Sequence, residues 1–390
     1  MGDPCCGQNF NPSVSNLNFW LTEQCPFQCV YCYEKGRNMV RSATWEIVKG
    51  VIDWLVQPNV STGSTHHINF FGGEPLLKID LIEKALLYSF TIQRKHGRKI
   101  NFGVTTNGYL FTDEILDLFK TFNCSILLSL DGDIETQGKY RGAGSEESRM
   151  RMAETVFSNA RKIAEMFPNT TVRMTVVPES IKDIRRNIEF ILGLGFKHIS
   201  PHFVNDGYTP LSTSDVAVYQ KVMEEEVFPF LVDYFWKTGE VPIATISKLF
   251  TRKEMHSPCG AGKGFLGVSV DGGIYPCHRF VYWDEWKLGD FTSPKLDWGK
   301  REFFFRFDNR RDIQKCKDCG MLHCGFRCFA SNYARYGSLT EVSSEECQIY
   351  AIDYNISQRL KNELSRSPSF IQKFLVPKKD VTPQYLRGKR

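Results

Sequence analysis

The sequence predicts an α/β fold in which a parallel sheet is followed by a compact cysteine-rich region, and three observations lead to this prediction. Six short apolar runs alternate with amphipathic stretches of helical period through the first half of the chain. Repeated strand–helix–strand units of this kind build parallel sheets. Seven of the thirteen cysteines gather in the later part of the chain. In a chain of 390 residues with no secretory signal, such a cluster favours metal ligation over disulfide bonds.

The strands are predicted from their apolar runs, each of which ends at polar or turn-forming residues. The strands span 16–21, 68–71, 100–105, 125–129, 172–177 and 198–203, and the helices between them span 44–55, 81–96, 113–121, 149–166 and 181–194. Asp80, with Glu83 three residues later, is predicted to cap the second helix, and Thr112 precedes the third. Six units fit a partial barrel as well as an open sheet. In both arrangements an active site lies at the carboxyl ends of the strands.

The chain divides into five predicted parts. They are a flexible N-terminus (1–13), the strand–helix units (14–213), a bridging region (214–256), the cysteine-rich region with a last helix (257–365) and a basic tail (366–390). The bridging region begins with a longer helical stretch, and the last helix spans 346–364. Because the cysteine-rich part contains only short elements, we expect bound metal to hold it together in place of a large apolar core.

The composition excludes several classes of protein. With 42% hydrophobic and 24% charged residues, it is that of a globular protein. The net charge of +5 is too small, and too little clustered outside the tail, to indicate nucleic-acid binding. No apolar run approaches the ~18 residues of a membrane span, and the N-terminus lacks the features of a signal peptide. We therefore expect a cytoplasmic protein with no membrane or nucleic-acid partner.

Three cysteines directly after the first strand carry the strongest chemical signal. Cys25, Cys29 and Cys32 form the pattern C-x-x-x-C-x-x-C. Three thiolates at this spacing can hold three irons of a [4Fe–4S] cluster and leave the fourth iron open to an outside ligand, whereas ordinary ferredoxin clusters use four cysteines. A structural zinc site is one alternative, although zinc prefers four ligands and no fourth Cys or His is near in the sequence. Three unligated, buried thiols are another.

Together with the six strand–helix units, this motif resembles the radical S-adenosylmethionine (SAM) superfamily. The resemblance implies a partial (β/α)6 TIM barrel, and it implies that the amino and carboxylate groups of SAM chelate the open iron. An electron, supplied by an external donor such as flavodoxin or ferredoxin, would then cleave SAM to a 5′-deoxyadenosyl radical that removes hydrogen from a substrate. The cofactor carries the hard chemistry, while the protein supplies position and electrostatics.

Other motifs of that family follow in order at the ends of the predicted strands. Gly72, Gly73, Glu74 and Pro75 resemble the motif that contacts the SAM amino group, since glycine permits close backbone approach and a carboxylate can pair with an ammonium. By resemblance, the remaining SAM contacts are Tyr31 beside the adenine, Thr106 and Asn107 after the third strand, Ser129 and Asp131 near the ribose, and Arg141 at the carboxylate. Each is a weak signal alone, because such residues also form turns and caps.

The second set of cysteines has the layout C-x17-C, then C-x2-C-x4-C-x3-C, then a last Cys. This layout resembles the SPASM domain, a C-terminal extension with two auxiliary [4Fe–4S] clusters, with one residue fewer than usual between Cys319 and Cys324. The resemblance assigns Cys316, Cys319, Cys324 and Cys347 to one cluster and Cys259, Cys277 and Cys328 to the other, which makes three clusters in the whole chain. A zinc ribbon is the alternative, but seven ligands do not divide into fours.

The smaller set of auxiliary ligands leaves one iron without a cysteine. That iron could bind a substrate group directly, or another residue or water could fill the place. Cys124, at the start of an apolar strand, is predicted to be a small core residue. Cys5 and Cys6 are predicted to be a disordered pair, although they could also ligate the open iron.

Enzymes with SPASM domains mostly modify peptides or proteins, so the resemblance implies a peptide substrate such as a ribosomally made precursor. In sulfatase-maturating relatives an Asp that acts as a base follows the second SPASM cysteine, whereas this chain has His278. His278 is either a base or a structural hydrogen-bond donor. Arg279 could bind a peptide carboxylate or carbonyl group. The segment around them also resembles peptide-crosslinking relatives.

Three functions therefore remain open, besides a nucleic-acid modifier, to which the modest charge gives little support. The leading one is a radical SAM enzyme that forms a side-chain crosslink (C–C, C–O or thioether) in a ribosomal peptide. The alternatives are an anaerobic sulfatase-maturating enzyme that makes formylglycine and a non-catalytic iron–sulfur electron carrier, which would need no open iron. The aromatic run 301–307 is either a docking surface or, as we expect, the buried face of a helix or strand.

Overall fold

The computed structural model describes residues 13–34, 40–204, 208–293, 295–321, 323–324 and 328–376. These residues form a nine-stranded sheet in the order β6-β5-β4-β3-β2-β1-β7-β8-β9. The predicted strands are β1 (Asn16–Thr22), β2 (Thr65–Gly72), β3 (Lys99–Thr106), β4 (Ser125–Ser129), β5 (Thr171–Val176) and β6 (His198–Phe203). Each pairs in parallel with the next along the chain. The predicted α/β fold with repeated strand–helix–strand units is confirmed.

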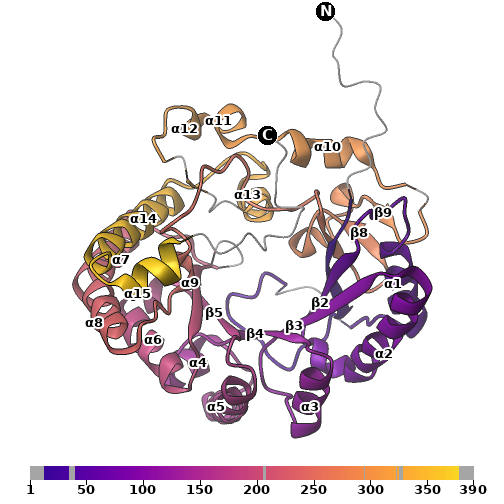
Figure 1. The fold of residues 1–390 in the computed structure, drawn as a ribbon, viewed down its shortest axis with the longest axis horizontal. Coiled ribbons are helices and arrows are strands. Elements are labelled where there is room, and N and C mark those ends of the chain that lie inside the picture. Colours follow the sequence, from indigo (N-terminus) through magenta and orange to yellow (C-terminus); the bar gives the residue numbers. More distant parts are fainter. Residues whose placement is uncertain are drawn as a thin grey trace, which may run out of the picture.

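The connecting helices cover the outer side of the curved sheet, as expected for a partial barrel (Figure 1). They are α1 (Trp45–Leu55), α2 (Ile79–His96), α3 (Asp113–Thr121), α4 (Ile134–Tyr140), α5 (Glu146–Met166) and α6 (Ile184–Gly193), the last preceded by the 3-10 turn η2 (Pro178–Asp183). Apolar strand residues such as Phe19, Phe70 and Leu128 are fully buried in the layer between sheet and helices. This layer is the main hydrophobic core, and it fixes the positions of the loops at the carboxyl ends of the strands.

One predicted helix start is confirmed and another is wrong. Thr112 caps α3, because its side chain accepts a hydrogen bond from the amide of Ile115. Asp80 lies inside the first turn of α2 and caps nothing. The 3-10 turn η1 (Pro75–Lys78) runs directly into α2, and Glu74 caps that turn by accepting a hydrogen bond from the Leu76 amide at 3.1 Å. The chain therefore needs no further cap at the position of Asp80.

The bridging region and the last helices form one layer beside β6. The elements are α7 (Thr213–Val222), the π-helical turn η3 (Met223–Val227), α8 (Phe228–Thr238), α9 (Ala244–Ser247), α14 (Ser344–Leu364), α15 (Pro368–Phe370) and the π-helical turn η6 (Ile371–Leu375). α14 packs against α7, α8 and α9. Phe370 is fully buried against Phe235 and Phe250, so the chain is packed and helical up to this point. Cys5, Cys6 and the basic end of the tail lie outside the described residues.

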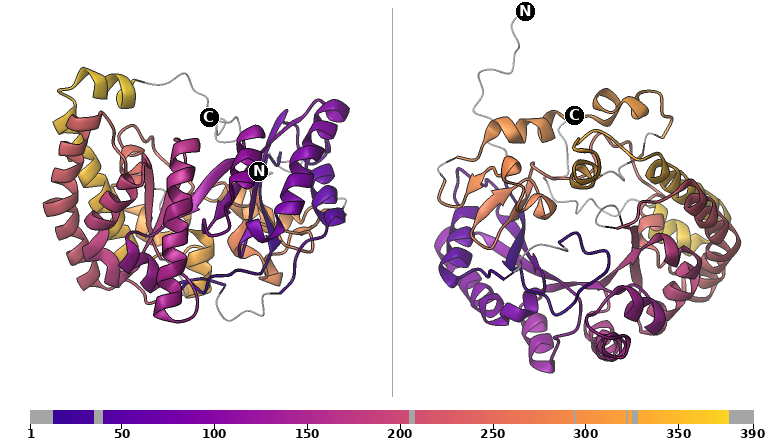
Figure 2. Two further views of the ribbon diagram at one scale, coloured as in Figure 1. Left: turned by 90° about the horizontal axis from the view of Figure 1, so that it is seen from below. Right: turned by 180° about the vertical axis from the view of Figure 1, so that it is seen from behind.

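The cysteine-rich region continues the barrel sheet. Its strand β7 (Phe265–Val268) pairs in parallel with β1, and β8 (Gly273–Tyr275) and β9 (Gly289–Asp290) add antiparallel strands. The other elements are the 3-10 turns η4 (His278–Phe280) and η5 (Asp284–Trp286) and the helices α10 (Trp298–Arg306), α11 (Asn309–Asp312), α12 (Gln314–Lys317) and α13 (Phe329–Tyr336). Figures 1 and 2 show these segments between the β1 side of the ring and α14. They therefore lie across the opening of the partial barrel.

A small aromatic core lies in this region, and it would act together with the metal that the sequence predicts. Phe280, Phe304 and Phe329 are buried, and their rings meet edge to face. The aromatic run 301–307 belongs to α10 and the residue after it, and it faces this core, as expected. Arg301 is also buried and donates hydrogen bonds to the carbonyl groups of Gly262 and Lys263. Among the described residues, no helix combines the length and the apolarity that a membrane span requires.

Candidate active site

The strands present two chemically different faces. Apolar side chains alternate with polar ones, and the apolar ones enter the core beneath the helices. The polar side chains therefore face the interior of the barrel. They include Asn16, Asn18, Asn69, Thr105, Ser129, Arg173, Thr175, Ser200 and His202. Neighbouring strands place these side chains side by side, as with the hydrogen bond of 3.0 Å from Asn69 Nδ2 to Thr105 Oγ1. The barrel interior is polar, in contrast to the packed apolar interior of a closed TIM barrel.

The loop after β1 brings the three predicted cluster cysteines together. Burial raises the pKa of each thiol, to about 12 for Cys25, and Cys29 lies close enough to act electrostatically on both Cys25 and Cys32. Backbone amides oppose this shift, among them the amide of Phe27, which lies 3.4 Å from Cys25 Sγ. The positive charge of Arg141 also opposes the rise in the pKa of all three thiols. The loop thus gathers three thiols around one buried cation.

The glycines after β2 pin this loop to the second strand. The amides of Gly73 and Glu74 donate to the carbonyl groups of Thr22 and Gln24, both at 2.9 Å. A Cβ atom on Gly73 would lie 2.2 Å from the Gln24 carbonyl oxygen, and one on Gly72 equally close to that of Thr22. Gly72 also has a φ of 125°, in the region that favours glycine. Only glycine allows the two strand ends to approach this closely, so these residues place the cysteine loop.

The carboxylate of Glu74, which the sequence predicts to pair with the SAM ammonium, also binds donors of the chain itself. It is fully buried and accepts hydrogen bonds from Thr106 Oγ1 and the Asn107 amide, both at 2.8 Å, as well as from the Leu76 amide. Burial raises its pKa to about 7, against these donors. Asn107 Nδ2 in turn lies 3.8 Å from Cys25 Sγ. Glu74 therefore joins the ends of β2 and β3, while Pro75 begins the turn that follows it.

Three further residues predicted to contact SAM form one buried cluster. The Tyr31 hydroxyl donates to Asp131, and Arg141 donates to the Tyr31 oxygen at 2.7 Å and forms an ion pair with Asp131 at 3.5 Å. The Thr175 amide also donates to Asp131. Burial raises the pKa of Asp131, although Arg141 opposes the shift. The cluster joins the cysteine loop to the ends of β4 and β5, and Ser129 lies beside it at the end of β4.

The chemistry of these donors fits a [4Fe–4S] cluster and SAM. Three neighbouring thiols, amides directed at sulfur and a nearby guanidinium are what thiolate ligands of an anionic cluster need. The Arg141 Nε atom is buried and finds no hydrogen-bond partner among the described residues, so this cation retains capacity to bind an acceptor.

The second set of cysteines falls into two groups. Cys259, Cys277 and Cys328 act on one another electrostatically, and burial raises the pKa of Cys277 well above its ordinary value. These three lie together, as the resemblance implies. Of the other four, Cys316 and Cys347 belong to the aromatic core, whereas Cys324 packs in a separate small cluster and Cys319 is exposed. Cys124 is buried in the barrel core, as predicted.

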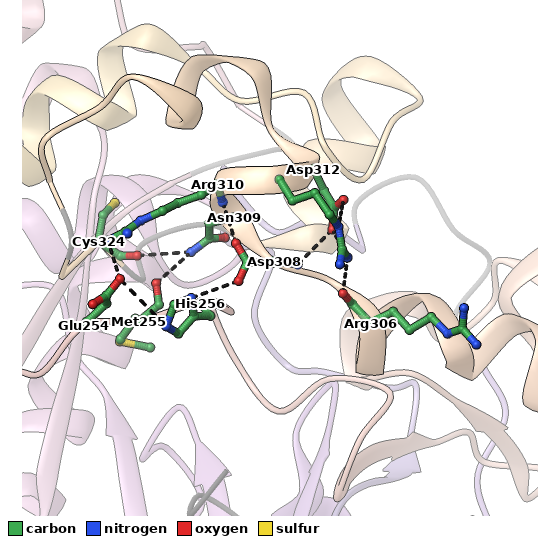
Figure 3. Close-up of polar contacts among 10 residues, drawn as sticks. Glu254, Met255, His256, Arg306, Asp308, Asn309, Arg310, Asp312 and Cys324 are labelled. Atoms are coloured by element: carbon green, nitrogen blue, oxygen red, sulfur yellow. Dashed lines mark hydrogen bonds and ion pairs between the residues drawn. The ribbon is translucent and has the colours of Figure 1, made fainter. Parts of the chain in front are cut away.

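A polar network holds the segments around Cys324 in place. Figure 3 shows how the chain before Cys259 meets the segment that contains α11. The side-chain amide of Asn309 donates to the carbonyl group of Cys324. Its backbone amide donates to the carbonyl group of His256 at 2.9 Å. His256 Nδ1 lies 2.9 Å from Asp308, and Arg310 forms an ion pair with Glu254. These contacts brace part of the cysteine-rich region independently of any bound metal.

The predicted pair His278 and Arg279 faces the barrel interior. His278 Nδ1 lies 2.8 Å from Asn18 Nδ2 on β1, so the amide donates and Nδ1 accepts. Burial, followed by the charge of Arg173, lowers the pKa of His278 to about 4, and the ring is therefore neutral near pH 7. Arg279 donates to Ser331 Oγ at 3.0 Å, and its guanidinium carbon lies 4.9 Å from the centre of the Tyr33 ring.

Tyr33 connects the two sets of cysteines. It directly follows Cys32, and the charges of both Cys32 and Cys277 raise its pKa further after burial has done so. The contact between Arg279 and Tyr33 therefore brings the segment after Cys277 against the loop after β1. The structure places the two predicted cluster sites on neighbouring parts of the barrel interior.

Sequence analysis missed the polar residues within the strands. Arg173 was included in a predicted strand only as part of an apolar run, and Asn18, Asn69 and His202 were passed over in the same way. The available signal was a charged or amide side chain at every second position of strands that should be covered on both faces. Some of these side chains line a cavity of about 270 Å³ bounded by Asn16, Leu17, Asn18, His67, Asn69, Gly260 and Phe265.

A parallel barrel with reactive side chains at the carboxyl ends of its strands is the architecture of an enzyme. Residues 21–191 match the model of the radical SAM superfamily, so the chain contains a radical SAM domain. This domain implies a [4Fe–4S] cluster and SAM, and it comprises the cysteine loop, the glycine motif and the Tyr31–Asp131–Arg141 cluster.

Three known proteins resemble the chain over most of its length. TigE, a radical SAM cyclopropyl synthase of Paramaledivibacter caminithermalis, is 21% identical over 369 residues, which cover 87% of this chain and 73% of TigE. A serine-type anaerobic sulfatase-maturating enzyme of Bacteroides thetaiotaomicron is 23% identical over 364 residues, which cover 80% and 81%. The structure of anSMEcpe with bound AdoMet and Cp18Cys peptide matches with a TM-score of 0.71 and 19% identity, covering 90% of this chain and 99% of anSMEcpe. The last comparison shows a shared fold.

Proposed function

We propose that this protein is a radical SAM enzyme that modifies a ribosomally made peptide by joining two of its side chains. The observation that carries the proposal is the meeting of the two cysteine sets across the barrel interior. Cys25, Cys29 and Cys32 would hold the cluster that binds SAM, and the Arg279–Tyr33 contact brings the region of Cys277 beside them. After hydrogen abstraction, the substrate radical must lose one electron to become an oxidised product. A second cluster, held by the cysteines around Cys277, would accept that electron.

The resemblance to TigE and to anSMEcpe supports a peptide substrate. When bound, the cluster and SAM supply the 5′-deoxyadenosyl radical that removes a hydrogen atom from the substrate. The chain's own residues would orient the reactants. Arg141 would hold the SAM carboxylate, and Tyr31 and Asp131 would keep the guanidinium in place through the contacts described above.

Two auxiliary clusters complete the proposal. Cys259, Cys277 and Cys328 would hold the one nearer the active site, with one iron open, and Cys316, Cys319, Cys324 and Cys347 would hold the other. An external reductant such as flavodoxin or ferredoxin would supply the electron that starts each turnover. Ser129, Thr106 and Asn107 lie at strand ends where they would border the nucleoside of SAM.

The surroundings of His278 favour crosslinking over formylglycine formation. Formylglycine chemistry needs a base to take a proton from the substrate side chain. His278 Nδ1 already accepts a hydrogen bond from Asn18, and a pKa of about 4 makes the ring a weak base. Its Nε2–H is then a donor, which suits the positioning of a peptide carbonyl group. The sulfatase-maturating relative keeps formylglycine formation as the second candidate.

A combined iron and turnover measurement tests the proposal. Anaerobically prepared protein should contain about twelve irons, and a Cys25/Cys29/Cys32→Ala variant about eight, given four irons in each cluster. The wild-type protein with dithionite should release 5′-deoxyadenosine from SAM, and the variant should release none. The short peptide encoded nearest to the gene should then lose two hydrogens and yield linked fragments on tandem mass spectrometry.

Other outcomes would change the assignment. A product that reacts with a hydrazide would identify an aldehyde and the second candidate. About four irons in the wild-type protein, all lost in the variant, would remove the auxiliary clusters and the peptide proposal built on them. A reduced protein with a full iron content that leaves SAM intact would be an electron carrier.

A further inference from the structure

The turn that carries Arg141 contains two glycines and needs outside contacts to keep one conformation. Arg141 directly follows α4, and its amide donates to the Gln137 carbonyl group at 2.9 Å. Gly142 and Gly144 come next, with φ angles of 101° and 81°, in the region that favours glycine. Because glycine loses more conformational freedom on ordering than any other residue, this turn is costly to hold in place.

Arg149 of α5 supplies two of the outside contacts. Its Nε atom donates to the Gly138 carbonyl group, and a terminal nitrogen donates to the Gly144 carbonyl group, both at 2.8 Å. A single planar guanidinium group thus joins the last turn of α4 to the far end of the glycine turn. The aliphatic part of Arg149 also packs beside Gly142, where an added Cβ atom would lie 3.1 Å from Arg149 Cγ.

The position of Arg149 brings no benefit to its own helix. α5 begins at Glu146 after the cap Ser145, so Arg149 lies near the N-terminal end. The helix dipole places partial positive charge at this end, which favours Glu146 and Glu147 and disfavours a cation. Within the described part of the chain, the partners of the Arg149 guanidinium are carbonyl groups and not a carboxylate. The contribution of this arginine therefore lies in the turn before α5.

The same turn also pairs with the cysteine loop. The Val30 amide donates to the Tyr140 carbonyl group at 3.0 Å, and the Gln28 amide donates to the Gly142 carbonyl group at 2.8 Å. Arg141 lies between these two hydrogen bonds. The conformation of the turn therefore decides where the Arg141 side chain stands relative to the cysteine loop.

We propose that Arg149 is a positioning residue for SAM, which holds this turn in the conformation that presents the Arg141 guanidinium to the SAM carboxylate. The inference rests on the role proposed for Arg141 and extends it to a residue that does not itself touch SAM. Arg141 must direct its guanidinium into the buried cluster with Tyr31 and Asp131. Without Arg149, the glycines let the turn leave this conformation, and SAM binds only the fraction of molecules in which the turn is formed.

A double-mutant cycle on SAM affinity tests this role. Anaerobic holoenzyme of unchanged iron content is titrated with SAM by calorimetry, without reductant or peptide. Arg149→Gln should weaken SAM binding about tenfold, which corresponds to a formed turn in about one molecule in ten. Arg141→Gln should weaken it about a hundredfold, because it removes a charge-assisted contact. Arg149→Gln should add little to Arg141→Gln, because a residue that acts through another is not additive with it.

Two further variants distinguish positioning from a general effect on folding. Arg149→Lys keeps the charge but can reach only one of the two carbonyl groups at a time, so it should retain part of the SAM affinity. Arg151→Gln is the matched control, because Arg151 lies on the same helix and pairs with Glu147 on the surface. It should bind SAM as tightly as the wild-type protein. Where a Gln variant loses iron, the Lys variant at that position takes its place in the cycle.

Two results would overturn the inference. If Arg149→Gln binds SAM as tightly as the wild-type protein, the turn keeps its conformation unaided. If the losses from Arg149→Gln and Arg141→Gln multiply in the double variant, Arg149 acts by a route other than Arg141. Unchanged SAM affinity in Arg141→Gln would instead defeat the role proposed for Arg141 itself. The measurement uses SAM alone, so its result is independent of whether the peptide modification proposed above is correct.

Discussion

The two regions of the molecule arrange their cysteines by different means. In the barrel, the loop with Cys25, Cys29 and Cys32 is attached to two strand ends through Gly73 and Glu74, and both ends rest on the large apolar core. In the cysteine-rich region, the cysteines lie in turns, in short helices and in the first turn of α14, around a smaller aromatic core. The barrel therefore preorganises its site through the fold, whereas the second region depends more on whatever its cysteines bind.

The two cores differ in kind as well as in size. The barrel core consists mainly of aliphatic side chains from parallel strands and their helices, so it is continuous around the curved sheet. The smaller core is built from rings that meet edge to face, such as Phe280, Phe304 and Trp286. Because β7 pairs with β1, the two regions share one sheet. The predictions below distinguish unfolding of each region by itself from unfolding of both together.

The largest effect should come from removing the proposed ligands of an auxiliary cluster. We expect combined Cys259→Ala, Cys277→Ala and Cys328→Ala substitutions to lower the local stability of residues 257–349 on the order of 5 kcal/mol, because bound metal contributes directly to the folding of metal-dependent regions. Hydrogen exchange followed by mass spectrometry should show fast exchange there and unchanged protection in β2–β5. The matched control is the Cys25/Cys29/Cys32→Ala variant, which should leave protection in both regions nearly unchanged. Equal protection in all three proteins would mean that the aromatic core suffices.

Truncation of one core side chain should have the next largest effect, and this effect should differ between the two regions. Leu128→Ala removes a fully buried side chain from β4 and should lower the global free energy of unfolding by about 3 kcal/mol. Phe304→Ala should cost about 4 kcal/mol, but only for opening of the cysteine-rich region. Denaturant-dependent hydrogen exchange distinguishes local from global opening. If Phe304→Ala also lowers the protection of β3 and β4, the two regions unfold as one cooperative unit and the comparison fails.

The sequence was sufficient to predict the barrel because its strands obey a simple pattern. Apolar residues that pack under the helices alternate with polar ones, and all six strands were located within a few residues of their observed ends. The short helix α4 was missed, because its sequence IETQGKY has no apolar period and its start depends on a cap by Asp133. The cap predicted at Asp80 was wrong because the preceding 3-10 turn supplies the helix start.

The site could be predicted only in part. Motif spacing located the thiols and the residues of the Tyr31–Asp131–Arg141 cluster. The hydrogen bonds that organise these residues, however, join positions far apart in the chain. Tyr31 with Asp131 is one example, and Glu74 with Thr106 is another. Arg173 lies in a run that is typical of an ordinary strand, and its position between Ser129 and Ser200 is known only when the neighbouring strands are in register. The contact of Tyr33 with Arg279 depends in the same way on tertiary structure.

The contact between α14 and α7 should make the stability of the protein depend on pH. Asp353 of α14 is buried and accepts a hydrogen bond from Tyr219 of α7, and burial raises its pKa to about 7. The folded state therefore holds a proton that the unfolded state releases near pH 4, so this group's contribution to stability is lost as the pH rises from about 4 to about 7. Asp353→Asn keeps the acceptor oxygen and removes the charge. It should raise stability at pH 8 by on the order of 2 kcal/mol and flatten the pH profile.

Chemical denaturation at pH 5 and pH 8 measures this difference. At pH 5 only part of this contribution has been lost, because the unfolded state is ionised while the folded state is still protonated, so the variant should exceed the wild-type protein in stability by less than at pH 8. Asp53→Asn is a suitable control, because this half-exposed carboxylate pairs with Lys49 on the surface of α1. If Asp353→Asn were less stable than the wild-type protein at pH 8, the contact between α7 and α14 would stabilise the charged form of Asp353.

The smallest expected effect compares one helix cap from each region. Thr112 caps α3 of the barrel, and Ser343 caps α14 by accepting from the Glu346 amide at 3.2 Å. Replacement of either by Ala should cost about 1 kcal/mol, whereas Thr112→Ser and Ser343→Thr should cost little. The first turn of α14 carries Cys347, whose amide donates to the Ser343 carbonyl group. Because a ligand bound by Cys347 would hold this turn, Ser343→Ala should affect hydrogen exchange only in iron-depleted protein, while Thr112→Ala should act equally with and without iron. An equal effect of Ser343→Ala in both forms would show that Cys347 does not anchor the helix.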